Sequence, residues 1–64
     1  MGNAPQDRLI DIKEVSSLIG LKRATVYKYI KEKGFPRPIK LGSRASRWSY
    51  NQVMEWIEQQ KATA

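Results

Sequence analysis

The chain contains no cysteine and no histidine. Disulfide bonds are therefore excluded, and so are the common zinc sites, which are built from those two residue types. A domain of 64 residues buries only about 60% of its unfolded surface. Without disulfides or a metal, it must be stabilised by a compact and well-capped core or by a partner.

Long apolar runs are missing as well. The longest apolar stretch, counting glycine, is Leu18–Leu21, which is far shorter than a membrane span or the core of a signal peptide. We therefore expect no membrane partner and a cytoplasmic protein. The four glycines do not have the spacing of a dinucleotide-binding loop or a P-loop.

Nothing in the sequence predicts catalysis. Histidine and cysteine are absent, and the carboxylates of Asp11 and Glu14 fit the start of a helix. Glu55 and Glu58 share a helix with an apolar face, where they most simply serve solubility. An acid–base pair would need a pocket, which so small a core hardly supplies. We predict that the chain is not an enzyme and has no cofactor and no metal site.

Acidic residues are scarce in the middle of the chain. Residues 22–47 hold nine lysines and arginines against one acid, Glu32, and so carry a net charge of +8, while the rest carries −2. A basic segment between neutral or acidic ends is typical of a surface that binds a polyanion. A solvated lysine-rich surface would give the same count, so charge alone leaves both interpretations open.

The first helix has a clear start and a clear end. Asp11 is a favourable N-cap, and Glu14 completes a capping-box pattern. The apolar stripe of this helix is Ile12, Val15, Leu18 and Ile19. Gly20 is expected to end the helix because it readily takes the left-handed conformation.

A second helix is expected over about residues 22–33. Lys22 is a poor N-cap, so a start near Thr25 is a competing possibility. Gly34 is expected to end the helix, with Phe35 folding back against it. Two short helices joined by a tight turn form the helix-turn-helix pattern.

A β-hairpin and a third helix follow. Ile39 and Leu41 alternate with a lysine and predict a short half-buried strand, residues 42–43 open a turn, and Trp48 faces inward on the return strand. Ser49 caps the last helix, which fades after residue 60. Its core side is predicted to be Tyr50, Val53, Met54, Trp56 and Ile57.

The element order is helix, turn, helix, hairpin, helix. This order predicts a mainly α fold with a small β-hairpin, a winged helix-turn-helix. We expect residues 1–7 to form a flexible N-terminal tail, residues 8–60 the DNA-binding domain and residues 61–64 a C-terminal tail.

The outward face of the second helix is the first candidate binding surface. Its helical spacing separates the core residues Val26, Tyr29 and Ile30 from Ala24, Thr25, Tyr27, Lys28 and Lys31. Such a face can meet both phosphates and base edges, although an ordinary solvated face is the simpler alternative. The hairpin supplies the second set of candidates, which are Lys40, Ser43, Arg44 and Arg47.

Several aromatic side chains could stack on single-stranded bases. Each falls on a core stripe or beside a helix cap, and we predict that these four belong to the core: Tyr29, Phe35, Trp48 and Trp56. We expect only Tyr27 to be exposed.

The stretch from Leu9 to Ile57 resembles the AlpA family of prophage regulatory proteins, which is close to the winged-helix excisionases and the wider MerR-like group. The resemblance rests on the D-I-K-E-V, T-V-Y-K-Y-I, G-F-P-R-P-I-K-L-G, R-W and V-M-E-W-I segments. It implies a winged helix-turn-helix that binds phage or genomic-island DNA and acts as a transcription regulator, an excisionase or both. By similarity, the DNA contacts are Arg23, Thr25, Tyr27, Lys28, Ser43 and Arg44.

Double-stranded DNA is thus the expected partner. Cooperative self-association on DNA and contact with an integrase or RNA polymerase stay open. Two other functions also stay open: a protein-interaction module that docks an acidic partner, and a nonspecific nucleic-acid binder. A duplex reader needs the basic helix face and the hairpin tip on one surface, whereas a partner module does not.

Overall fold

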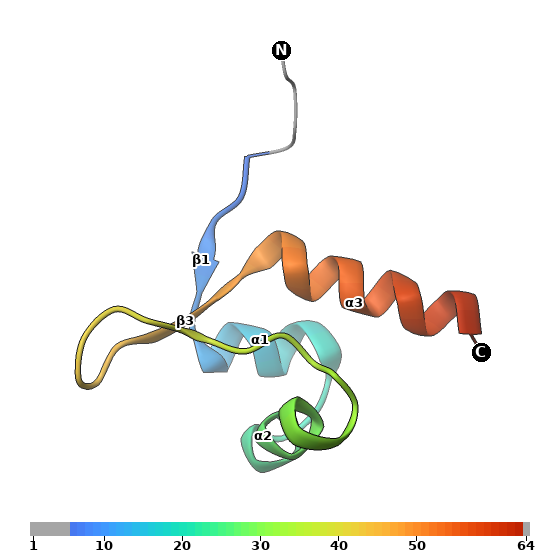
Figure 1. The fold of residues 1–64 in the computed structure, drawn as a ribbon, viewed down its shortest axis with the longest axis horizontal. Helices are drawn as coiled ribbons and strands as arrows, with labels where there is room; N and C mark the ends of the chain where they lie inside the picture. Colours follow the sequence, from blue (N-terminus) through green and yellow to red (C-terminus); the bar gives the residue numbers. More distant parts are fainter. Residues whose placement is uncertain (1–5, 64) are drawn as a thin grey trace.

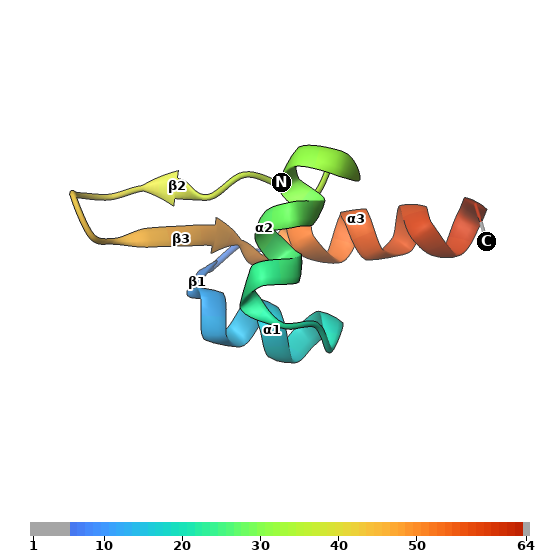
Figure 2. The same cartoon turned by 90° about the horizontal axis from the view of Figure 1, so that it is seen from below.

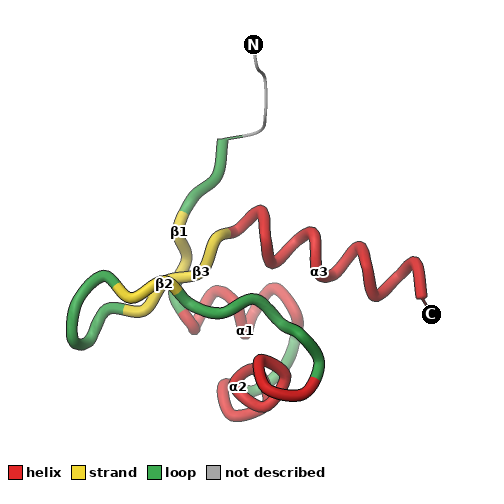
Figure 3. The backbone as a smooth tube through the Cα atoms, viewed as in Figure 1, coloured by secondary structure: helices red, strands yellow, loops and turns green. Residues whose placement is uncertain are grey.

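The computed structural model describes residues 6–63, and over them it contains three helices and a small antiparallel sheet (Figure 1). The elements are β1 (Leu9–Ile10), α1 (Ile12–Ile19), α2 (Arg23–Glu32), β2 (Ile39–Lys40), β3 (Ser46–Ser49) and α3 (Tyr50–Thr63). This order confirms the predicted mainly α winged helix-turn-helix. The backbone trace shows how the short strands link the helices (Figure 3).

Helix α1 begins and ends where the sequence predicts. An Asp11 carboxylate oxygen accepts the Glu14 backbone N–H at 2.9 Å, which caps the first turn. Gly20 takes φ 68° and donates its N–H to the Ser16 carbonyl at 2.8 Å. The Glu14 carboxylate accepts a hydrogen bond from the Arg8 guanidinium at 2.7 Å.

Helix α2 begins at Arg23, which supports the predicted start near residue 22 over the alternative start near Thr25. Lys22 is the N-cap residue in extended conformation, and no side chain caps the first turn. At the other end Gly34 takes φ 70°, and the Phe35 N–H reaches back to the Tyr29 carbonyl at 3.2 Å. Gly34 therefore ends the helix as expected, and the Phe35 ring is buried, but this bond spans one residue more than the bond of a Schellman motif.

The sheet has the order β1-β3-β2, with both pairs antiparallel. Strand β1 was not predicted, because two residues are too few to show a strand period. It pairs Ile10 with Trp48, while β2 pairs Ile39 with Arg47. The predicted hairpin between β2 and β3 is confirmed, and the Leu41 N–H closes it on the Ala45 carbonyl at 2.8 Å.

One face of the sheet packs on all three helices. Paired residues share a face, so Ile10 and Trp48 point the same way, toward the core. The core cluster is Ile10, Val15, Val26, Phe35, Trp48 and Val53. The predicted half-burial of Ile39 and Leu41 is wrong, since they are 43% and 56% exposed. Ile39 pairs with Arg47, which alternates with Trp48, so it lies on the uncovered face.

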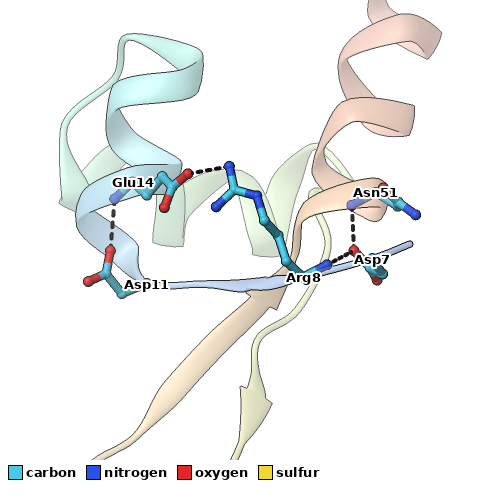
Figure 4. A network of polar contacts seen from close by, with 5 residues as sticks. All are labelled: Asp7, Arg8, Asp11, Glu14 and Asn51. Carbon is cyan, nitrogen blue, oxygen red and sulfur yellow. Dashed lines mark hydrogen bonds and ion pairs between the residues drawn. The ribbon is translucent and has the colours of Figure 1, made fainter. Parts of the chain in front are cut away.

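Asp7 contacts the start of α3, which lies far from it in the sequence (Figure 4). The Asp7 carboxylate accepts the Asn51 backbone N–H at 2.9 Å and the Ser49 hydroxyl. It therefore caps α3 from a distant part of the sequence, and its negative charge suits the positive end of the helix. The predicted tail of residues 1–7 stays a prediction, with its last residue, Asp7, held by these hydrogen bonds. The rest of that predicted tail, apart from Gln6, lies outside the described residues.

Helix α3 is longer than predicted. Ser49 caps it as expected, with its hydroxyl oxygen accepting the Gln52 N–H at 3.2 Å. The helix continues to Thr63, so the predicted end after Gln60 is wrong, and the predicted C-terminal tail from Lys61 is helical as far as Thr63. No glycine or proline follows Gln60 to stop it, and Lys61 and Ala62 are good helix formers. Ala64 lies outside the described residues.

The Asp7 cap predicts a pH-dependent stability. The hydrogen bond from Ser49, followed by that from the Asn51 backbone, lowers the pKa of Asp7 below its ordinary value of 3.8. A lowered folded-state pKa gives stability that is present above the unfolded-state pKa and is lost as pH falls through the folded-state pKa. We therefore expect the melting temperature of the parent to exceed that of Asp7→Asn at pH 7. The gap should narrow as the pH falls below 3.8 and through the lowered folded-state pKa of Asp7. Thermal melts of both proteins across this range test it, and a gap that does not vary with pH would contradict the charge-based cap.

Candidate nucleic-acid interface

The outer face of α2 is open to solvent. Four of its predicted contact residues are exposed, namely Arg23, Ala24, Lys28 and Lys31. Tyr27 is also exposed, at 44%, while its ring lies 6.1 Å from that of the buried Trp48. Thr25 is half-buried. The helical period thus identified a face that carries hydrogen-bond donors and positive charge, with Thr25 at its edge.

The β2–β3 hairpin projects away from the three helices (Figure 2). Its tip is exposed and carries Ser43 and Arg44, which follow the bend at Gly42. Lys40 lies on β2 and donates its ammonium to the Ser46 hydroxyl at 3.0 Å. The hairpin therefore extends a basic surface beyond the body of the domain.

A groove joins α2 to the hairpin. It is an open concavity of about 420 Å³ lined by Tyr27, Ile30, Lys31, Arg37, Pro38 and Lys40. The first three residues come from α2, and the others come from β2 and the segment before it. Two predicted basic contacts, Lys31 and Lys40, are thereby brought to one surface, as a duplex-binding interface requires.

Arg47 lies apart from this groove. Its strand partner is Ile39, so it shares the face of the sheet that points away from Trp48 and α2. Its guanidinium donates to the Ser46 carbonyl at 2.9 Å, and the side chain is half-buried. The predicted role of Arg47 in DNA contact stays a prediction, and any contact it makes comes from another face than that of Lys40.

Among the described residues, the cations around the groove form no ion pair with an acidic side chain. Within residues 6–63 the ion pairs join Arg8 to Glu14 and Lys61 to Glu58, all outside the groove. The positive charge of Lys31 and Arg37 is therefore not neutralised within the described chain. Sequence reasoning missed Arg37. The signal that could have found it is its position between two prolines, directly after a helix with a basic outer face.

The remaining aromatic rings belong to the core. Trp48 and Phe35 are buried, and Tyr29 and Trp56 are half-buried and pack against the cluster. The Trp56 ring N–H donates to the Lys33 carbonyl at 3.2 Å. Tyr27 is the exposed aromatic residue, as predicted. Over the described part of the chain, no helix has the length and apolar character to span a bilayer.

The helix-turn-helix and the projecting hairpin together define a small winged helix-turn-helix protein. Within this class, the chain belongs to the family of the prophage CP4-57 regulatory protein AlpA, whose model matches residues 8–61. This confirms the resemblance drawn from the sequence segments. The family is one of regulatory proteins and is not an enzyme family.

A phage protein is also similar to this chain. The uncharacterized protein ORF88 of Enterobacteria phage P4 is 35% identical over 52 residues, which cover 81% of this chain and 59% of the phage protein. The chain thus spans about three fifths of the length of that relative. No solved structure matches the chain at a significant level.

Proposed function

We propose that this chain binds double-stranded DNA in a sequence-specific manner and regulates a prophage or genomic island. In this proposal it acts as a transcription regulator, as an excisionase that directs recombination, or as both. The observation that carries the proposal is the groove between α2 and the hairpin, where Lys31 and Lys40 come together and neither forms an ion pair within residues 6–63. A duplex has the matching shape and charge.

The second helix is the proposed reader of sequence. A helix of this size fits the major groove, where lysine can contact guanine and small or hydroxyl side chains can meet thymine or phosphate. Lys28 and Ala24 are exposed on the outer face of α2 and have no other assigned role. The hairpin is the proposed clamp, because Arg44 at its tip can reach a neighbouring phosphate or the minor groove.

Two other functions have less support. Single-stranded binding uses several exposed aromatic rings, and Tyr27 is the exposed one here. Docking of an acidic protein would not need the helix and the hairpin to share one groove, yet residues of both line it. The prophage regulatory family also favours DNA.

The test distinguishes base contacts made by α2 from phosphate contacts made by the hairpin. A binding site is first selected from random duplexes, and affinities for that site and for unselected DNA are then compared. Lys28→Ala should weaken the binding free energy for the selected site by about 1–3 kcal/mol. It should also relax the base preference at one position of that site. Arg44→Ala should weaken both duplexes by a similar factor, because a phosphate contact carries no sequence information.

The matched control is Lys61→Ala, which also removes one lysine. Lys61 belongs to the last turn of α3 and pairs with Glu58 at 3.2 Å. The C-terminal end of α3 lies away from the hairpin (Figure 1). This variant should bind both duplexes as the parent does. If selection enriches no motif, sequence-specific binding is ruled out. If Lys28→Ala weakens both duplexes equally, α2 is not the reader.

A further inference from the structure

We infer that the groove between α2 and β2 seats the sugar-phosphate backbone of one DNA strand, with Arg37 as a phosphate contact. The inference rests on the proposed function and deepens it. It names a binding subsite between the two basic elements and adds a residue that neither helical periodicity nor the family resemblance supplies.

The path of a duplex leads to this groove. If α2 enters the major groove and the hairpin reaches the next minor groove, one backbone strand separates the two. That strand must cross the space between α2 and the hairpin. The concavity of about 420 Å³ is the hollow between these elements, and residues of both line it.

The lining of the groove matches the chemistry of that strand. Its apolar part is formed by Tyr27, Ile30 and Pro38, which suits the face of a deoxyribose ring. Its cations are Lys31, Arg37 and Lys40, which suit the flanking phosphates. A pocket for a neutral ligand would not need three cations, and a purely ionic surface would not need an apolar floor.

Arg37 is held on a rigid segment. Pro36 and Pro38 fix φ on either side of it, and a residue before proline is restricted to extended conformations. The Pro36 carbonyl accepts the ring N–H of Trp48 at 3.0 Å, which ties the segment to the core. Phe35, at the start of this segment, is buried.

A rigid backbone lowers the entropy that is lost when a side chain binds. The planar guanidinium also matches the oxygens of a phosphate. The Arg37 side chain itself is exposed, so it is available to a ligand at the mouth of the groove.

The first test is the salt dependence of duplex binding in Arg37→Ala. Loss of one phosphate contact should make the slope of log affinity against log salt shallower by about one. At 0.1 M salt, affinity for selected and unselected duplexes should fall by a common factor on the order of tenfold. Arg37→Lys, which keeps the charge, should retain the parent slope.

Lys33→Ala is the matched control. Lys33 is close to Arg37 in sequence, but its ammonium lies 6.0 Å from the Tyr29 ring, and that ring faces Trp56 of α3 rather than the groove. This variant should keep the parent slope and affinity. Both alanine variants should melt at the parent temperature, because both side chains are exposed. If Arg37→Ala and Lys33→Ala show the same slope of log affinity against log salt, the inference is overturned.

The second test locates the phosphate. Single neutral methylphosphonate groups are placed along each strand of the selected duplex, one position at a time. We expect one position that weakens the parent but has no further effect on Arg37→Ala. If every position weakens both proteins equally, Arg37 makes no phosphate contact, although the proposed function still stands on the Lys28 result. If the parent does not bind duplex DNA at all, the proposed function itself fails.

Discussion

Replacing Trp48 with alanine is expected to lower the free energy of unfolding by about 3–5 kcal/mol. Its side chain is fully buried, and it is the largest residue in the core. Its ring N–H donates to the Pro36 carbonyl at 3.0 Å, and its ring contacts Tyr27 of α2. The loss is comparable to the whole stability of so small a domain. Circular dichroism should therefore show no cooperative melt for this variant.

Two milder variants keep this prediction testable. Trp48→Phe retains an aromatic ring but leaves the Pro36 carbonyl without its donor, which should cost about 1–3 kcal/mol and preserve a cooperative transition. Leu41→Ala removes an apolar side chain that is 56% exposed, so it should change stability by less than about 0.5 kcal/mol. If Trp48→Ala melts cooperatively within a few degrees of the parent, Trp48 does not anchor the core.

Trp48 also shows which parts of the fold could be predicted from sequence. The helix ends depend on local chemistry, because Asp11, Gly20 and Ser49 act within a few residues of their own positions. Periodicity then placed Trp48 inside. The hydrogen bond from Trp48 to Pro36, which ties β3 to the segment between α2 and β2, joins residues that no local pattern links.

The features that the sequence did not predict share a physical cause. Strand β1 exists only because Ile10 pairs with Trp48, and Asp7 is ordered by capping a helix that begins far along the chain. Ile39 has the alternation of a half-buried strand, but it lies on an open face of the sheet and is exposed. Each outcome depends on tertiary contacts, which override local preference.

The candidate site divides in the same way. The outer face of α2, with Lys28 and Lys31, could be predicted from the helical period alone. The groove could not, because it depends on where the segment before β2 lies relative to α2. Arg37 belongs to that segment, and the sequence gives no measure of its distance from Lys31. Arg47 is the opposite case. The sequence placed it in the same basic set as Lys40, but the strand register turns it to the other face of the sheet.

The strongest solution effect is expected from salt. Residues 22–47 carry a net charge of +8, and those that line the groove or lie on the outer face of α2 and the hairpin tip suggest about five or six phosphate contacts. The slope of log affinity against log salt should then be about −5, so raising salt from 50 to 200 mM should weaken duplex binding roughly a thousandfold. Fluorescence anisotropy with a short labelled duplex measures this directly.

Two controls identify the origin of the salt effect. Thermal melts over the same salt range should show a folded protein throughout, because the ion pairs Arg8–Glu14 and Lys61–Glu58 are exposed and contribute little. A single strand of the same length should bind more weakly, because it presents no grooves for α2 and the hairpin, and Tyr27 is the exposed ring available for stacking. A duplex slope near zero would mean that phosphate contacts do not drive binding. Equal affinity for the single strand would mean that the groove between α2 and the hairpin does not recognise the shape of a duplex.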